Sequence, residues 1–97
     1  MSIQDFKIYK GQGLLRFEFD TENTDISGGT AVIKYKKPSG TAGQWTGIID
    51  GTIIKYQVTD NLTIDEAGDW KFMPEVTVSG LLGICDEVII PVLEPAL

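Results

Sequence analysis

The chain of 97 residues contains no histidine and a single cysteine, Cys85. Histidine is the commonest general base and the commonest ligand of transition metals in proteins. Its absence excludes Ser-His-Asp triads and argues against zinc hydrolases and most copper or iron sites. A lone cysteine forms no intramolecular disulfide, and no histidine is present to activate its thiol. We therefore predict a non-enzymatic protein with no cofactor and no metal, in which Cys85 has a structural role.

Basic residues are also scarce, because 8 Lys and Arg stand against 14 Asp and Glu and leave a formal net charge of −6. This charge repels phosphate backbones, so we expect no nucleic-acid partner. The bases that do cluster, Lys34, Lys36 and Lys37, fit the solvated face of a strand. No run approaches the roughly 18 apolar residues that span a bilayer, and the N-terminus lacks a signal-peptide pattern. We expect synthesis in the cytoplasm and no membrane partner.

Short stretches of alternating apolar and polar residues run through the whole chain. In one of them Leu15, Phe17 and Phe19 alternate with charged residues, as in a strand with one buried face. Turn-forming residues separate these stretches, and no helical period of 3.6 residues persists in the sequence. We predict about seven strands, at residues 3–9, 14–19, 30–37, 44–49, 52–58, 69–78 and 84–93.

The stretch 62–78 contains the best candidate for the centre of the core. Acids and Gly68 crowd into residues 65–69, so a sharp turn is expected there. The strand that follows should bury one face, which carries Trp70, Phe72, Val76 and Val78. We also expect Ile26, from the polar loop 20–29, and Leu62 and Ile64 to close the open ends of the core.

Turn signals fix the expected connections between strands. The dipeptide Asp50-Gly51 is the strongest of them and predicts a two-residue type I′ hairpin turn. The Pro- and Gly-containing segment 38–43 predicts a second hairpin connection, and the segment 79–83 a further turn. Pro91 removes a backbone donor, so the last strand should lie at a sheet edge or carry a bulge.

These elements predict one domain, residues 1–97, of the all-β class. Many short strands with regular turns are typical of a Greek-key sandwich or a small barrel. We prefer an immunoglobulin-like antiparallel β-sandwich, because a polar corner followed by a buried aromatic on the penultimate strand resembles its E–F corner. The inter-sheet disulfide of that fold is absent, so burial of Trp45, Trp70 and the Phe and Ile side chains must stabilise the core.

Two patterns suggest a ligand, and each has a simpler explanation. Oxygen-bearing side chains that would suit calcium gather in one segment, but their spacing does not match an EF-hand loop, and adjacent acids in a turn are usually solvated; they are Asp60, Asn61, Asp65, Glu66 and Asp69. Trp45 and Tyr35 would form a sugar-stacking platform if both were exposed. Large aromatics usually fill the core, so a carbohydrate-binding module is the alternative function.

Four elements occur in a recognisable order. They are a Lys-Lys-Pro-x-Gly hairpin at 36–40, Trp45 in the returning strand, a strand at 51–56 from Gly51 to Tyr56, and an Ala-Gly-x-Trp corner at 67–70. With the closing segment IIPVLEP, this order resembles the N-terminal β-sandwich domain of phage baseplate upper proteins and related prophage tail proteins. The likeness spans nearly the whole chain. Its motifs are elements of fold rather than of catalysis.

The resemblance implies a structural part of a virion tail, in a homo-oligomer or a hetero-assembly with other phage tail proteins. Such a domain binds through outward-facing apolar side chains and open strand edges. The residues on the outward parity that we expect at the interface are Val32, Ile48, Ile53 and Ile89.

Overall fold

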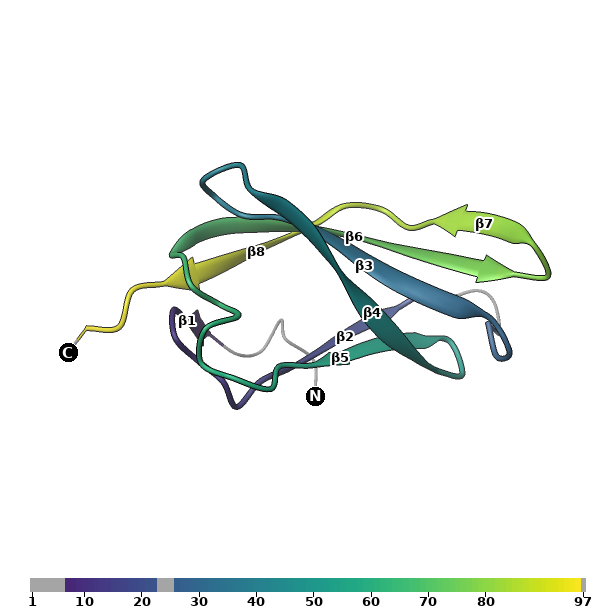
Figure 1. Cartoon of the computed structure of the whole chain (residues 1–97), viewed down its shortest axis with the longest axis horizontal. Coiled ribbons are helices and arrows are strands. Elements are labelled where there is room, and N and C mark those ends of the chain that lie inside the picture. Colours follow the sequence, from purple (N-terminus) through teal and green to yellow (C-terminus); the bar gives the residue numbers. More distant parts are fainter. Residues whose placement is uncertain (1–6, 23–25, 97) are drawn as a thin grey trace.

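A computed structural model describes residues 7–22 and 26–96 of the chain. The described part is built from strands and contains no helix (Figure 1). The strands are β1 (Ile8–Tyr9), β2 (Arg16–Asp20), β3 (Thr30–Lys36), β4 (Ala42–Asp50), β5 (Ile53–Gln57), β6 (Gly68–Val78), β7 (Leu81–Ile84) and β8 (Val88–Leu93). The all-β class is therefore confirmed, with eight strands where about seven were predicted.

The strands hydrogen-bond in the order β1-β8-β6-β3-β4-β5-β2, and β7 pairs with β6 beside β8. All pairs are antiparallel except β1 and β8, in which Ile8 lies opposite Val92 and both strands run the same way. The prediction of a purely antiparallel arrangement was wrong at this pair. Two parallel neighbouring strands need a long connection, and here nearly the whole chain lies between β1 and β8. The parallel pair was missed because the alternation of residues along a strand does not show which strand it pairs with.

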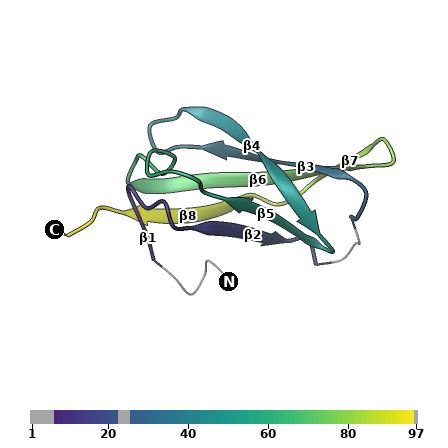
Figure 2. The same ribbon diagram turned by 60° about the horizontal axis from the view of Figure 1, so that its bottom comes forward.

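The sheet curls into a half-barrel because β4 takes part in both of its halves. Residues 42–47 of β4 pair with β3, whereas Ile48, Ile49 and Asp50 pair with β5 (Figure 2). Gly47 lies where β4 changes partner, and a Cβ atom there would stand 2.6 Å from Cγ2 of Ile54. The missing side chain lets the curl close tightly. The immunoglobulin-like arrangement of these strands stays a prediction.

Aromatic rings from both halves of the sheet meet in the core. The ring of Phe72 on β6 lies 5.2 Å from that of Phe17 on β2 and 5.5 Å from that of Trp45 on β4, measured between centroids. Trp70 is completely buried, as the sequence predicts. These contacts across the curl add to the pairing of β4 with both halves, because each large buried side chain stabilises the fold by about 1.5–3 kcal/mol.

Two of the three side chains expected to close the core do so. Ile26 and Ile64 are buried, whereas Leu62 is 80% exposed, so the prediction for Leu62 was wrong. The physical reason lies in Asp60, whose carboxylate accepts hydrogen bonds from the backbone N–H groups of Leu62 and Thr63. This bend keeps Leu62 on the outside and lets Ile64 face inward.

The hairpin between β4 and β5 differs from the predicted turn by one residue. Asp50 lies opposite Ile53, so the two turn residues are Gly51 and Thr52, and Gly51 carries the positive φ of 63°. Thr52 does not share this positive φ, and a positive φ at the first turn position only is the mark of a type II′ hairpin rather than type I′.

A type I′ pattern occurs instead between β6 and β7. Ser79 and Gly80 both have positive φ, 52° and 79°, and Val78 lies opposite Leu81. Residues 81–84 therefore continue as a strand, where the sequence predicted a turn over 79–83 and a single strand over 84–93.

Pro91 was expected to lie at a sheet edge or at a bulge. Among the described residues β1 pairs with β8 at Val92 and Leu93, and Pro91 lies opposite Asp69 of β6 with no described residue paired on its other side. Most of the first predicted strand, residues 3–9, lies outside the described residues. Within 7–22 and 26–96 there is no helix of the length and apolarity that would cross a membrane.

Candidate docking surface

Alternate residues of β3, β4 and β6 point away from the core and form a surface that we call the outer face. In one row across it, Val32 of β3 lies opposite Thr46 of β4 and Glu75 of β6, and Glu75 lies opposite Ile84 of β7. The ladder therefore brings side chains from four strands onto one surface.

The four predicted interface residues lie on four different strands. Ile48 on β4 and Ile89 on β8 are 66% and 53% exposed, whereas Val32 and Ile53 are half-buried. Val32 and Ile48 belong to the neighbouring strands β3 and β4. Ile53 lies opposite Asp50 beside the β4–β5 turn, and Ile89 lies opposite Lys71 of β6. The strand ladders thus distribute the four along the sheet.

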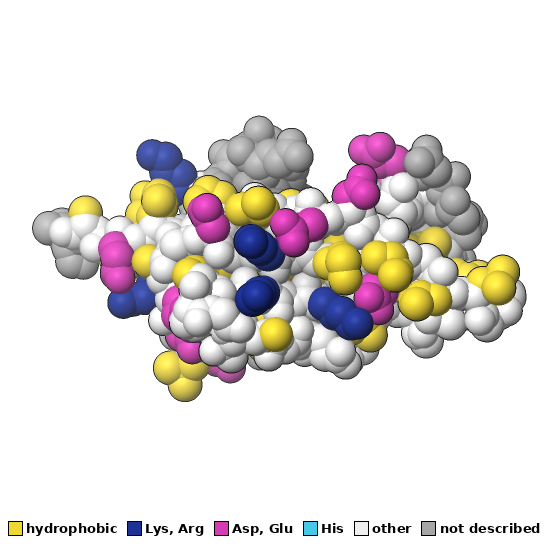
Figure 3. All heavy atoms as spheres, turned by 90° about the horizontal axis from the view of Figure 1, so that it is seen from above, with side chains coloured by type: hydrophobic (Ala, Val, Ile, Leu, Met, Phe, Trp, Pro, Cys, Tyr) yellow, Lys and Arg dark blue, Asp and Glu magenta, His cyan; other side chains and the backbone are white. Residues whose placement is uncertain are grey.

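One exposed apolar feature was not predicted from the sequence. The β6–β7 hairpin extends beyond the rest of the sheet (Figure 1) and exposes three large apolar side chains, namely Leu81, Leu82 and Ile84. Seen from above, hydrophobic side chains gather over this end of the molecule (Figure 3). Several exposed large apolar side chains on one hairpin favour a binding surface there.

The register of the hairpin determines where these side chains point. Leu82 lies opposite Thr77 and Ile84 lies opposite Glu75, so both share the outer face with residues of β6. Alternating residues before the Ser79-Gly80 dipeptide and apolar residues after it form a hairpin signal in the sequence. That signal would have identified the strand.

β7 also leaves one of its edges open. Among the described strands it pairs with β6 alone. No described strand pairs with the backbone N–H and C=O groups on its other side, which is the kind of edge that accepts a strand from another molecule. An open edge beside exposed leucine and isoleucine side chains is a geometry suited to protein–protein contact.

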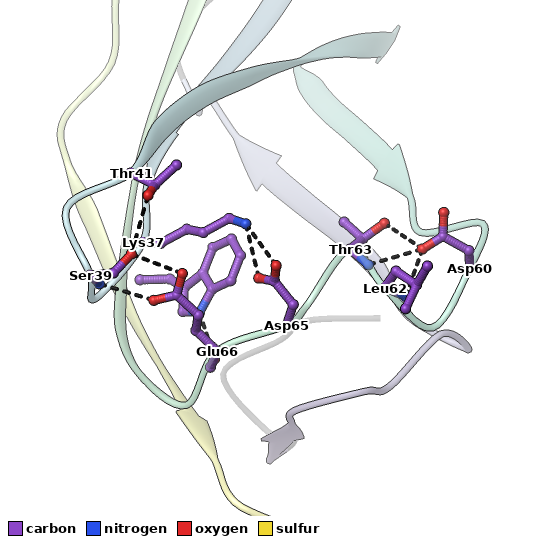
Figure 4. Close-up of polar contacts among 9 residues, drawn as sticks. Lys37, Ser39, Thr41, Asp60, Leu62, Thr63, Asp65 and Glu66 are labelled. Carbon is purple, nitrogen blue, oxygen red and sulfur yellow. Dashed lines mark hydrogen bonds and ion pairs between the residues drawn. The ribbon is translucent and has the colours of Figure 1, made fainter.

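A cluster of polar contacts holds the β3–β4 connection against the segment that precedes β6 (Figure 4). Lys37 Nζ lies 2.9 Å from a carboxylate oxygen of Asp65, and the backbone N–H and hydroxyl of Ser39 donate to the Glu66 carboxylate. The indole Nε1–H of Trp70 donates to the Glu66 carbonyl at 2.9 Å, and Lys37 Nζ stands 5.6 Å from the Trp70 ring centroid. The hydrogen bond with Asp65 raises the pKa of Lys37.

These contacts explain the acidic residues that the sequence offered as calcium ligands. Asp65 and Glu66 bind Lys37 and Ser39, and Asp60 binds the backbone of its own loop. Among the residues that the structure describes, no group of three or more acidic or cysteine side chains is placed to hold a metal ion. The acids here position the corner that presents Trp70 to the core.

The aromatic pair proposed as a sugar platform is mostly covered. Trp45 is buried, its ring stacks on Tyr56 at 4.3 Å, and it lies 5.0 Å from the ring of the half-buried Tyr35. A flat exposed indole is what a carbohydrate-binding platform needs. Trp45 instead contributes its area to the core.

Cys85 lies between β7 and β8 and is half-buried. Its backbone N–H donates to the Pro74 carbonyl at 2.9 Å. Burial raises the pKa of the thiol, and the neighbouring Asp86 adds to that effect. A raised pKa favours the protonated thiol over the nucleophilic thiolate at neutral pH.

Comparison with protein-family models and with curated proteins found no match to this chain. The proposals that follow therefore depend on the surface just described and on the motif resemblance.

Proposed function

We propose that the chain is a non-enzymatic structural domain of a phage or prophage tail, associated with a baseplate or fibre, that acts through protein–protein contacts. The observation that supports this most is the β6–β7 hairpin, which exposes Leu81, Leu82 and Ile84 beside an open strand edge. The resemblance of the motifs at 36–40, 45, 51–56 and 67–70 to phage baseplate domains supports the same function.

The hairpin offers two ways of binding at once. The apolar side chains of Leu82 and Ile84 lose water when a partner covers them, which stabilises a complex by roughly 25 cal/mol per Å² of apolar surface. The edge of β7 accepts a neighbouring strand by β-augmentation, in which backbone hydrogen bonds fix the register. Partners would be other tail proteins or further copies of the same chain, and the protein would reside in the virion.

A pair of serine substitutions tests this proposal. Leu82→Ser and Ile84→Ser change exposed side chains, so each should alter the free energy of unfolding by less than about 0.5 kcal/mol. The same variants should lose self-association, measured by analytical ultracentrifugation, and binding to co-expressed phage tail proteins, measured by co-purification.

Leu62→Ser is the matched control, because Leu62 is 80% exposed but lies in the loop between β5 and β6. It should leave association unchanged. If the hairpin variants assemble like the unmodified chain, or if Leu62→Ser weakens assembly equally, the hairpin is not the docking surface. A chain that stays monomeric at high concentration and binds no tail protein contradicts the proposed function as a whole.

A further inference from the structure

The few basic residues of this acidic chain are concentrated at one end of β3 and β6. Four of its 8 Lys and Arg lie there, namely Lys34, Lys36, Lys37 and Lys71. Two of them have acidic partners, since Lys34 pairs with Glu75 at 3.2 Å and Lys37 pairs with Asp65. Lys36 and Lys71 are the other two, and they lie directly opposite each other in the β3–β6 ladder.

Two lysines that face each other across a sheet repel one another. Directly opposed residues on one face have Cβ atoms about 4.5–5.5 Å apart, and like charges at that spacing destabilise the pair. Within residues 7–22 and 26–96 neither Lys36 nor Lys71 forms an ion pair. No acid among the described residues is therefore ion-paired with either lysine, although the chain contains 14 acids.

The two lysines border a shallow hollow of about 300 Å³. Its wall is formed by the β3–β4 connection on one side and the start of β6 on the other, and its residues are Lys36, Lys37, Pro38, Gly40, Asp69 and Lys71. Viewed from above, basic side chains stand next to each other near the middle of this surface (Figure 3). The hollow is open to solvent and large enough for one or two carboxylate groups.

We propose that this hollow binds carboxylate side chains of an acidic segment in a partner protein. Lys36 and Lys71 supply two positive charges, and a carboxylate between them removes their repulsion while forming charge-assisted hydrogen bonds. The net charge of −6 opposes a long polyanion such as nucleic acid, whereas a short run of carboxylates contacts only the hollow, where three lysines outnumber Asp69. Ile89, opposite Lys71, adds an apolar contact on the flank.

That the partner is a tail protein rests on the proposed function. The hollow adds that the contacting segment of this partner is acidic. The hollow lies beside the start of β6 and the β6–β7 hairpin at its end, so the two sites are separate. Each part is tested with variants that leave the other unchanged.

The first experiment measures repulsion in the free chain. Replacing Lys36 by glutamine should raise Tm by roughly 1–5 °C at low salt, because it removes the like-charge pair. Lys10→Gln is the control, since Lys10 pairs with Glu94 at 3.0 Å and its loss relieves no such repulsion. A Tm for Lys36→Gln at or below that of the unmodified chain contradicts the proposal.

The second experiment uses hexaglutamate as the probe and hexaglutamine as its neutral match, with NMR amide shifts as the readout. Hexaglutamate should shift the amide signals of Lys36, Lys71 and Gly40, and hexaglutamine should not. The affinity should fall about two- to fivefold for each lysine removed, and so about 4- to 25-fold for Lys36→Gln combined with Lys71→Gln. Lys10→Gln should leave the affinity for hexaglutamate within about twofold of that of the unmodified chain.

Equal hexaglutamate binding by the double variant, or shifts centred away from the hollow, overturn the inference. The experiment needs only the isolated chain, so a failure here leaves the hairpin test of the proposed function unaffected. Conversely, if the chain proves not to be a phage tail protein, hexaglutamate binding at the hollow still tests the carboxylate site.

Discussion

Replacing Trp70 by phenylalanine is the sharpest test of how the corner before β6 is held to the core. Trp70 is fully buried, and its indole N–H donates to the Glu66 carbonyl at 2.9 Å. Lys37 stands 5.6 Å from the ring centroid while paired with Asp65. The substitution keeps an aromatic ring in the core but removes the donor and the outer part of the indole.

The expected loss of stability can be worked out from these contacts. A phenyl ring lacks roughly two of the indole carbons, which at about 0.8 kcal/mol per buried carbon amounts to about 1.6 kcal/mol. The lost hydrogen bond adds about 0.5–1.5 kcal/mol. Trp70→Phe should therefore lower the free energy of unfolding by about 2–3 kcal/mol, or lower Tm by roughly 10–20 °C in a domain of this size.

Urea denaturation followed by circular dichroism measures this change, and Trp45→Phe is the matched control. Trp45 is also buried, but its ring contacts are with Tyr35, Tyr56 and other core rings, so its replacement removes mainly apolar contact. We expect the Trp70 variant to be the less stable of the two by about 0.5–1.5 kcal/mol. If Trp70→Phe unfolds at the same urea concentration as the unmodified chain, the corner does not depend on the indole.

Two further predictions concern close packing and acid stability. Gly43→Ala places a Cβ atom against the hydroxyl and ring of Tyr35, so thermal unfolding should show a loss of about 1–3 kcal/mol from overpacking. Hydrogen bonds from the backbone of Leu62 and the hydroxyl of Thr63 hold the pKa of Asp60 below its usual 3.8. Because the folded pKa is the lower one, this contribution is present above the unfolded pKa and is lost as the pH falls through the folded pKa. Asp60→Asn should therefore flatten the decline in stability below about pH 4, and an unchanged decline would contradict this assignment.

The sequence predicted the buried faces of the strands well because alternation has a direct physical meaning. A strand places successive side chains on opposite faces, so Phe17, Ile33, Ile54 and Trp70 could be assigned to the core from their spacing alone. The same rule assigned the side chains of Ile48 and Ile89 to the solvent-exposed face, and both are exposed. It overestimated the exposure of Val32 and Ile53, which neighbouring strands half cover.

Local turn chemistry was predicted less completely. The Asp50-Gly51 signal placed a hairpin correctly but shifted it by one residue, and the Ser79-Gly80 signal was not recognised as a hairpin turn. Both segments contain turn formers, and the choice between turn types depends on the register of the strands on either side. For that reason Leu81, Leu82 and Ile84 were missed as exposed residues of a strand.

What the chain determined by itself is therefore its class and its faces: strands instead of helices, Trp70 in the core, and lysines outside. The tertiary structure alone decided which strands are neighbours. Only the pairing of β3 with β6 sets Lys36 opposite Lys71. Among the described strands β7 pairs with β6, and this pairing leaves its other edge unpaired beside exposed leucines. The physical reason is that periodicity fixes which way a side chain points, whereas its neighbour across the sheet comes from a segment tens of residues away.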